Sequence, residues 1–287
     1  MYSFSIKTRN LELKGLANTP TPIGSHEHDI VIALHGWQDN AASFAPLMSS
    51  MPNDIPMYAF DWPGHGGSDW RGDDAHYYFV DYVDDLNQVI EQLSAKRIHL
   101  VGHSMGAMVA SLFCACFADK VASLTLIEGI GLLSATPVEL KSLLQRALVQ
   151  RGREAKMRVY DSEHALICRR EAVSDFDYDI AAQLMQRNIA VVANGVTLTT
   201  DPKIKHYSAF RFSESQAHAL LDDICIPTLF IKGIDGYQQV KNNEVLFSHH
   251  YSNLSVQSID GGHHCHMQNG AQCARLIGAH LRQNGAR

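Results

Sequence analysis

One pentapeptide constrains the fold of this 287-residue chain more than any other feature. Residues 102–106 read Gly-His-Ser-Met-Gly, between a strand-like run at 97–101 and a helix-like run of small, apolar residues at 107–117. A serine at the tip of such a strand–turn–helix occupies a strained backbone conformation, and its glycine neighbours let strand and helix approach closely. The pattern therefore predicts that Ser104 is a nucleophile lifted above a sheet edge, and not part of an ordinary glycine–serine turn.

Strand and helix patterns alternate on both sides of this turn. Two alternating runs, 3–8 and 11–17, predict an opening hairpin. Further strands are expected at 30–34, 57–60, 121–127, 227–231 and 254–259, and further helices at 80–93 and about 269–282. This alternation is typical of an α/β protein with a mostly parallel sheet covered by helices on both faces.

The rhythm changes in the middle of the chain. From about Leu132 to Asp223 the pattern is mainly helical, and it shows no strong buried strand. We therefore expect a core domain of residues 1–131 and 224–287, interrupted by a helical cap of residues 132–223. Apolar cap residues such as Leu144, Leu148 and Leu184 are expected to pack against the sheet domain.

Composition excludes several classes of protein. A net charge of −6 gives no overall positive field to recruit nucleic acid. No run reaches the roughly 18 apolar residues that a membrane-spanning helix needs, so no membrane partner is expected. The six cysteines are scattered without a C-x-x-C pair, which favours reduced thiols and a cytoplasmic location.

Several motifs together resemble the α/β-hydrolase superfamily over nearly the whole chain. They are the pentapeptide around Ser104, the His-Gly-Trp of residues 35–37 and the Asp-x-x-Gly-x-Gly-x-Ser of residues 61–68. More narrowly, residues 35–44 and 262–266 resemble the serine hydrolase-like subgroup, whose members are mostly presumed hydrolases with poorly defined substrates. The resemblance implies that the amides of Trp37 and Met105 form an oxyanion hole, and the Met105 amide also lies at a predicted helix N-terminus.

The resemblance also implies a general base in the loop after the last strand, at residues 260–266. His263 follows a glycine pair at the family's position and is preferred to His264, while His266 is expected to pack or hydrogen-bond nearby. The alternative is a metal cluster of these histidines. Adjacent side chains usually diverge, and no cysteine or carboxylate motif completes a tetrahedral set. We therefore expect no metal and no organic cofactor.

Two carboxylates compete for the role of the acid that orients this base. Asp235 follows the strand at 228–231, the usual location in the superfamily, although it could equally be a turn residue beside Gly236. Glu128 follows the strand at 121–127, where some superfamily members place their acid. Asp235 is preferred and Glu128 is the alternative.

These residues predict a serine hydrolase that cleaves carboxyl esters of short or medium acyl chain through an acyl-enzyme. One alternative is a C–C bond hydrolase of ring-fission diketones, and another is a non-catalytic ligand-binding member of the fold. The expected partner is a small acyl substrate. The cap also carries a group of arginines that could receive an anionic substrate or an acyl carrier, although such a run is more often a solvated helix face: Arg146, Arg151, Arg153 and Arg158.

Overall fold

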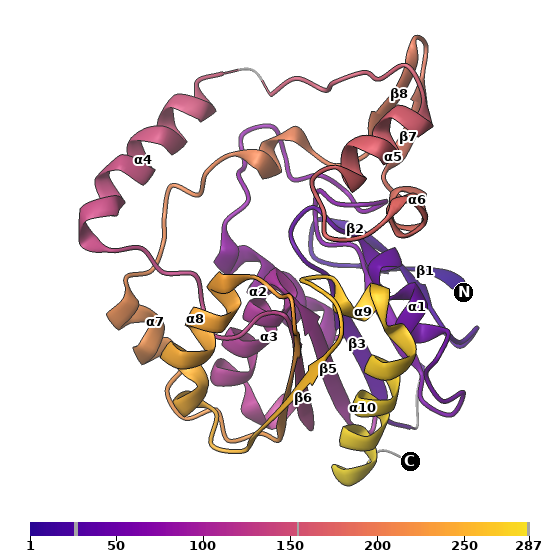
Figure 1. Ribbon diagram of the computed structural model, residues 1–287, viewed down its shortest axis with the longest axis vertical. Helices are drawn as coiled ribbons and strands as arrows, with labels where there is room; N and C mark the ends of the chain where they lie inside the picture. Colours follow the sequence, from indigo (N-terminus) through magenta and orange to yellow (C-terminus); the bar gives the residue numbers. More distant parts are fainter. Residues whose placement is uncertain (26–27, 154, 286–287) are drawn as a thin grey trace.

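An eight-stranded sheet forms the centre of the protein (Figure 1), whose computed structural model describes residues 1–25, 28–153 and 155–285. The strand order is β1-β2-β4-β3-β5-β6-β9-β10. Six of the strands are mutually parallel, and β1 and β2 are antiparallel to their neighbours. The strands are β1 (Tyr2–Lys7), β2 (Glu12–Ala17), β3 (Ile30–Leu34), β4 (Met57–Phe60), β5 (Ile98–His103), β6 (Ser123–Ile127), β9 (Thr228–Gly233) and β10 (Leu254–Ile259).

The mostly parallel sheet and the opening hairpin are both confirmed, and β1 pairs with β2 from Tyr2–Ala17 to Lys7–Glu12. Alternate residues of β3 enter different cores: Ile32 joins the cluster under α2 and α3, and Val31 joins the cluster under α1 and α10. Both faces of the sheet are therefore covered, which explains why the central strands are apolar throughout.

Helices of the core follow or flank these strands. Among the described residues, no helix is long and apolar enough to cross a membrane. The core helices are α1 (Ala45–Met48), α2 (Phe79–Ile90), α3 (Met105–Cys116), α8 (Gln238–Phe247), α9 (Cys265–Gln268) and α10 (Gly270–Gln283), with 3-10 turns η1 (Ala41–Phe44), η2 (Ala118–Lys120) and η4 (Ser248–His250).

Residues 132–223, here called the insertion, connect β6 to β9. In the view of Figure 1 most of them lie above the sheet, and their last helix lies beside α8. They contain a hairpin that the sequence analysis missed, β7 (Ile189–Val192) with β8 (Gly195–Leu198). The overlooked signal is the Asn-Gly pair at 194–195 between two β-branched runs, a strong hairpin turn. The other elements are α4 (Pro137–Arg151), α5 (Glu163–Glu171), α6 (Tyr178–Met185), η3 (Pro202–Lys205) and α7 (Glu214–Leu220).

The insertion packs unevenly. Leu184 of α6 is fully buried, as expected. In contrast, Leu144 and Leu148 of α4 are 44% and 55% exposed, so the expectation that they pack against the sheet domain is wrong. Only Ala147 of α4 is buried, and Figure 1 shows α4 on the opposite side of the insertion from α5 and α6.

Candidate active site

Ser104 is the single residue that connects β5, which ends at His103, to α3, which begins at Met105. Its φ of 50° and ψ of −115° are strained for a residue with a side chain, as the sequence pattern predicts. The flanking glycines are required by close packing, because a Cβ on Gly102 would lie 2.5 Å from the Ala107 Cα and a Cβ on Gly106 would collide with the Leu34 carbonyl oxygen. The turn therefore holds the Ser104 hydroxyl at the carboxyl end of the sheet.

A hydrogen-bonded chain of three side chains starts at this serine. The Nε2 atom of His263 lies 2.9 Å from the Ser104 Oγ, and its Nδ1 atom lies 3.2 Å from the Oε2 of Glu128. A carboxylate only accepts hydrogen bonds, so the Nδ1 of His263 carries the ring proton and Nε2 is free to accept one from Ser104. Both partners are buried, with His263 7% and Glu128 1% exposed.

The carboxylate beside His263 is Glu128 and not Asp235, which the sequence analysis preferred. Asp235 is exposed, and its backbone N–H donates to the carbonyl oxygen of Gly261. Glu128 fills the space beside the turn instead: its Oε1 accepts from the Gly233 N–H at 2.8 Å, and a Cβ on Gly236 would collide with that carboxylate. The alternative, Glu128, is thus the carboxylate that contacts His263, because the tight turn after β9 carries Asp235 outward.

Tyr237 is a contact of the histidine that sequence reasoning did not find. Its ring stacks on the ring of His263 with centroids 4.1 Å apart and planes 9° from parallel. The residue follows the turn at 233–236, and no local motif marks it. The stacked ring restricts rotation of the imidazole about its side-chain torsions.

The candidate oxyanion donors lie on two sides of Ser104. Met105 is the first residue of α3, so its N–H has no acceptor within the helix and lies at the positive end of the helix dipole. The loop of residues 35–38 approaches from β3, and a Cβ on Gly36 would lie 3.2 Å from the Ser104 Cβ. Trp37 follows directly, 51% exposed, with its Nε1 donating to the Ile204 carbonyl oxygen of the insertion at 3.3 Å.

His264, the rival base, points away from Ser104 and into a buried ionic cluster. Its Nδ1 lies 2.5 Å from Oδ1 of Asp175, and its Nε2 lies 3.5 Å from Oδ2 of Asp39. Burial alone would lower the pKa of His264, but the two carboxylates outweigh it and raise the pKa to about 9. Arg170 completes the cluster at 2.6 Å from Asp39, whose pKa these cations hold well below its usual range despite burial.

Asp175 also fixes the backbone of the loop that carries His263. Its Oδ2 accepts from the His264 N–H at 2.9 Å, and its carbonyl oxygen accepts from the Gln268 side chain at 2.7 Å. Gln268 in turn accepts from the Gly262 N–H at 2.9 Å. On the opposite side, His103 donates from Nε2 to the His263 carbonyl oxygen at 2.9 Å. The insertion and β5 thus hold this loop from two directions.

The three sequence-adjacent histidines do not converge on a common point. His266 is fully buried with neither ring nitrogen hydrogen-bonded, its ring 4.1 Å from that of His103, and burial holds its pKa well below its usual value. Two other sets bring possible ligand atoms within 4.8 Å of one another in the described part of the chain. One set is Asp39, His103 and His264, which belongs to the ionic cluster that Arg170 and Asp175 complete. The other set is His218, His249 and His250, at the junction of α7 and η4.

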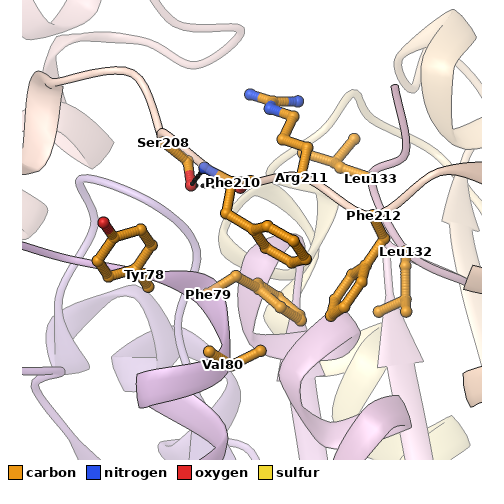
Figure 2. Close-up of a pocket in the computed structure, with 9 residues that line it drawn as sticks. All are labelled: Tyr78, Phe79, Val80, Leu132, Leu133, Ser208, Phe210, Arg211 and Phe212. Atoms are coloured by element: carbon orange, nitrogen blue, oxygen red, sulfur yellow. Dashed lines mark hydrogen bonds between the residues drawn. The ribbon is translucent and has the colours of Figure 1, made fainter. Parts of the chain in front are cut away.

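An apolar pocket of about 110 Å³ lies between the start of α2, the residues that follow β6 and the segment before α7. Figure 2 shows the rings of Phe79, Phe210 and Phe212 gathered around it, whereas Arg211 points away. Leu132 of the same lining lies three residues after Gly129, and a Cβ on Gly129 would lie 2.6 Å from the Ser104 carbonyl oxygen. Leu132 and Leu133 of the lining thus follow closely after Glu128 along the chain.

Comparisons with known proteins identify the family to which this fold belongs. A model of the α/β hydrolase fold family matches residues 29–270. A serine hydrolase-like protein of Danio rerio is 29% identical over 262 residues, covering 86% of this chain and 79% of the relative. A serine hydrolase-like protein of Dictyostelium discoideum is 32% identical over 257 residues, covering 83% and 71%.

Solved structures support the same assignment. The crystal structure of a hypothetical protein from Pseudomonas aeruginosa PAO1 has a TM-score of 0.87 to this chain, at 28% sequence identity, covering 98% of this chain and 99% of that one. The matched family segment includes the strained serine, its histidine and the buried glutamate described above. The chain belongs to the α/β-hydrolase family and is related within it to the serine hydrolase-like proteins.

Proposed function

We propose that the protein is a serine hydrolase that cleaves carboxyl esters of short or medium acyl chain through an acyl-enzyme. The single observation that carries the proposal is the chain from Ser104 through His263 to Glu128, with donor–acceptor distances of 2.9 and 3.2 Å. A serine hydroxyl is a weak nucleophile by itself, and a neutral imidazole held in the right tautomer by a buried carboxylate activates it.

The first half-reaction forms the acyl-enzyme. The Nε2 atom of His263 takes the hydroxyl proton as the Ser104 Oγ attacks the ester carbonyl carbon, and Glu128 stabilises the imidazolium that forms. The carbonyl oxygen becomes an oxyanion, to which the N–H groups of Met105 and Trp37 donate. The tetrahedral intermediate then collapses: the bond to the alcohol oxygen breaks, and His263 returns its proton to that oxygen.

The second half-reaction returns the enzyme to its starting state. A water molecule attacks the acyl carbon while His263 takes one of its protons, and collapse releases the carboxylic acid with the proton returned to Ser104. One imidazole thus handles every proton, and because ester hydrolysis changes no oxidation state, the reaction needs no redox partner. Tyr237 supports both halves by keeping the His263 ring in one plane.

The apolar pocket of Figure 2 supports an acyl chain as the group that the enzyme recognises. Its volume of about 110 Å³ suits a short chain, and its lining is aromatic and aliphatic apart from Ser208 and Arg211. Burial of apolar substrate surface there contributes roughly 0.8 kcal/mol for each methylene group. Affinity should therefore rise with chain length until the pocket is full.

Steady-state hydrolysis of 4-nitrophenyl acetate, butyrate and hexanoate tests the proposal. We expect turnover by the wild type, and loss of at least about 10³-fold in kcat for Ser104→Ala. Ser142→Ala changes an exposed serine of α4 and is the matched control, with wild-type kinetics expected. Unchanged hydrolysis in purified Ser104→Ala would show that the mechanism is wrong.

A further inference from the structure

A second recess, of about 100 Å³, lies between the insertion and the core. The core contributes Gln38, from the loop after β3. The insertion contributes Arg169 and Arg170 of α5, Asn188 just after α6, and Lys205 at the end of η3. Part of the wall is apolar, so the recess combines fixed polar groups with a surface that excludes water.

Arg170 of this recess is paired with Asp39, but the other two cations of the lining, Arg169 and Lys205, have no such partner among the described residues. No acidic residue lines the recess. Burial lowers the pKa of Lys205, and the like charge of Arg169 lowers it further. Two neighbouring cations without an anion repel each other, and a bound anion would relieve that repulsion.

Two buried polar atoms in the lining are also without a partner. Asn188 is only 3% exposed, yet its Oδ1 makes no hydrogen bond, and the Nε of Arg170 is equally unpaired although its Nη2 contacts Asp39. Buried polar atoms are rarely left unsatisfied in folded proteins, because each costs about 1–3 kcal/mol. An occupant with both an anionic group and a hydrogen-bond donor would complete these contacts.

One lining residue of the recess, Gln38, belongs to the loop that packs against the nucleophile. Gly36 packs against Ser104, and Gln38 is two residues further along, so their Cα atoms are at most about 7.6 Å apart. Trp37 connects the two sides through its hydrogen bond to Ile204, the residue before Lys205. Because β3 and β6 flank β5, the loops that carry Gln38 and Leu132 approach the nucleophile from opposite sides.

We propose that this recess binds an anionic group, a carboxylate or a phosphate, on the leaving-group side of the substrate. This inference rests on the proposed ester hydrolysis and names its substrate class. The acyl chain occupies the apolar pocket beside Leu132, and the alcohol part extends past Trp37 toward Lys205 and Arg169. The enzyme therefore prefers esters whose alcohol carries a negative charge.

The test compares phenyl butyrate with 4-carboxyphenyl butyrate in the wild type and in a Lys205→Met/Arg169→Met double variant. The ratio of kcat/KM for the charged over the neutral ester should fall on the order of tenfold in the double variant, because only the charged ester loses an ionic partner. Lys141→Met removes an exposed lysine of α4 and should leave the ratio at its wild-type value. Comparing this ratio between variants cancels the intrinsic difference in leaving-group reactivity.

Each outcome has a distinct meaning. An unchanged ratio, or an equal fall for both esters, would overturn the anion site without touching the proposed function. Hydrolysis that survives Ser104→Ala would overturn the proposed function itself. If the double variant instead lowers the ratio of kcat/KM for 4-nitrophenyl adipate over 4-nitrophenyl hexanoate relative to the wild type, the anion lies on the acyl side. The leaving-group assignment would then be wrong.

Competitive inhibition by benzoate and by phenyl phosphate identifies the preferred anion. For the better inhibitor of the wild type, the Ki should rise on the order of tenfold in the double variant. The Ki of phenol, which has no charge, should not change. Equal inhibition of the wild type and the double variant by both anions would overturn the site. The single variant Arg169→Met, which alters an exposed side chain, repeats the test if the double variant does not fold.

Discussion

Asp175 of the insertion holds His264, the residue next to the proposed base, through a contact of 2.5 Å between Oδ1 and Nδ1. The same carboxylate accepts the backbone N–H of His264 at 2.9 Å. A Cβ on Gly262 would collide with it, so a glycine at that position is required for this approach. The position of His263 relative to Ser104 therefore depends on a segment that lies more than eighty residues earlier in the chain.

Removal of this contact should impair turnover more than binding. We expect Asp175→Ala to lower kcat about 10–100-fold for 4-nitrophenyl butyrate with little change in KM, because small displacements of a catalytic group are costly. Asp161→Ala, an exposed aspartate of the insertion, is the control and should match the wild type. A rise in KM alone, with kcat intact, would show that Asp175 does not position the base.

The charge on His264 predicts a pH dependence of stability. Since its folded-state pKa of about 9 exceeds the ordinary value of 6.5, the stabilisation is complete below about pH 6.5 and disappears as the pH rises through about 9. It amounts to at most about 3 kcal/mol. Urea unfolding at pH 7 and pH 10 should show that the difference between wild type and His264→Asn shrinks at the higher pH. A constant difference would contradict the ionic cluster.

Opposite results are expected for the two carboxylates considered as the acid. Glu128→Gln should lower kcat by about 10²–10⁴-fold at neutral pH, since the amide no longer stabilises the imidazolium of His263. Asp235→Asn should leave kcat within about twofold of the wild type, because its side chain is exposed. Steady-state kinetics on both variants decide the assignment, and the reverse pattern would restore Asp235 as the acid.

His266 offers a test of the buried surroundings of the site. Both of its ring nitrogens lack partners, and its ring lies 5.4 Å from that of Phe44. His266→Phe should therefore raise the free energy of unfolding by about 1 kcal/mol, because an unsatisfied polar ring is replaced by an apolar one. Denaturant unfolding measures this change. A loss of more than about 1 kcal/mol would indicate that His266 has a polar partner in solution.

Local patterns were enough to predict the strained turn at Ser104, its contact with His263 and most of the sheet. The turn around Ser104 is specified by neighbouring residues, because Gly102 and Gly106 are demanded by the same close packing that strains the serine. The β1–β2 hairpin likewise follows from alternation within fifteen or so residues of chain. The parallel strands are apolar because both faces of the sheet are covered.

The carboxylate that contacts His263 and the contacts of the insertion could not be predicted in the same way. Glu128 and Asp235 both follow strands that end at one edge of the sheet, and only the tight turn at Gly236 decides which carboxylate faces inward. The pairing of Asp175 with His264 joins residues 89 positions apart, and no periodicity records it. Such contacts are properties of the assembled tertiary structure.

Labelling with a small fluorophosphonate, followed by mass spectrometry of the intact and digested protein, tests the central claim most directly. An activated serine forms a covalent phosphonyl ester with loss of fluoride, whereas an ordinary serine does not react. The account predicts one adduct, on the peptide that contains Ser104, absent from Ser104→Ala and slowed in Glu128→Gln. No adduct on the folded wild type, or an adduct that persists in Ser104→Ala, would contradict it.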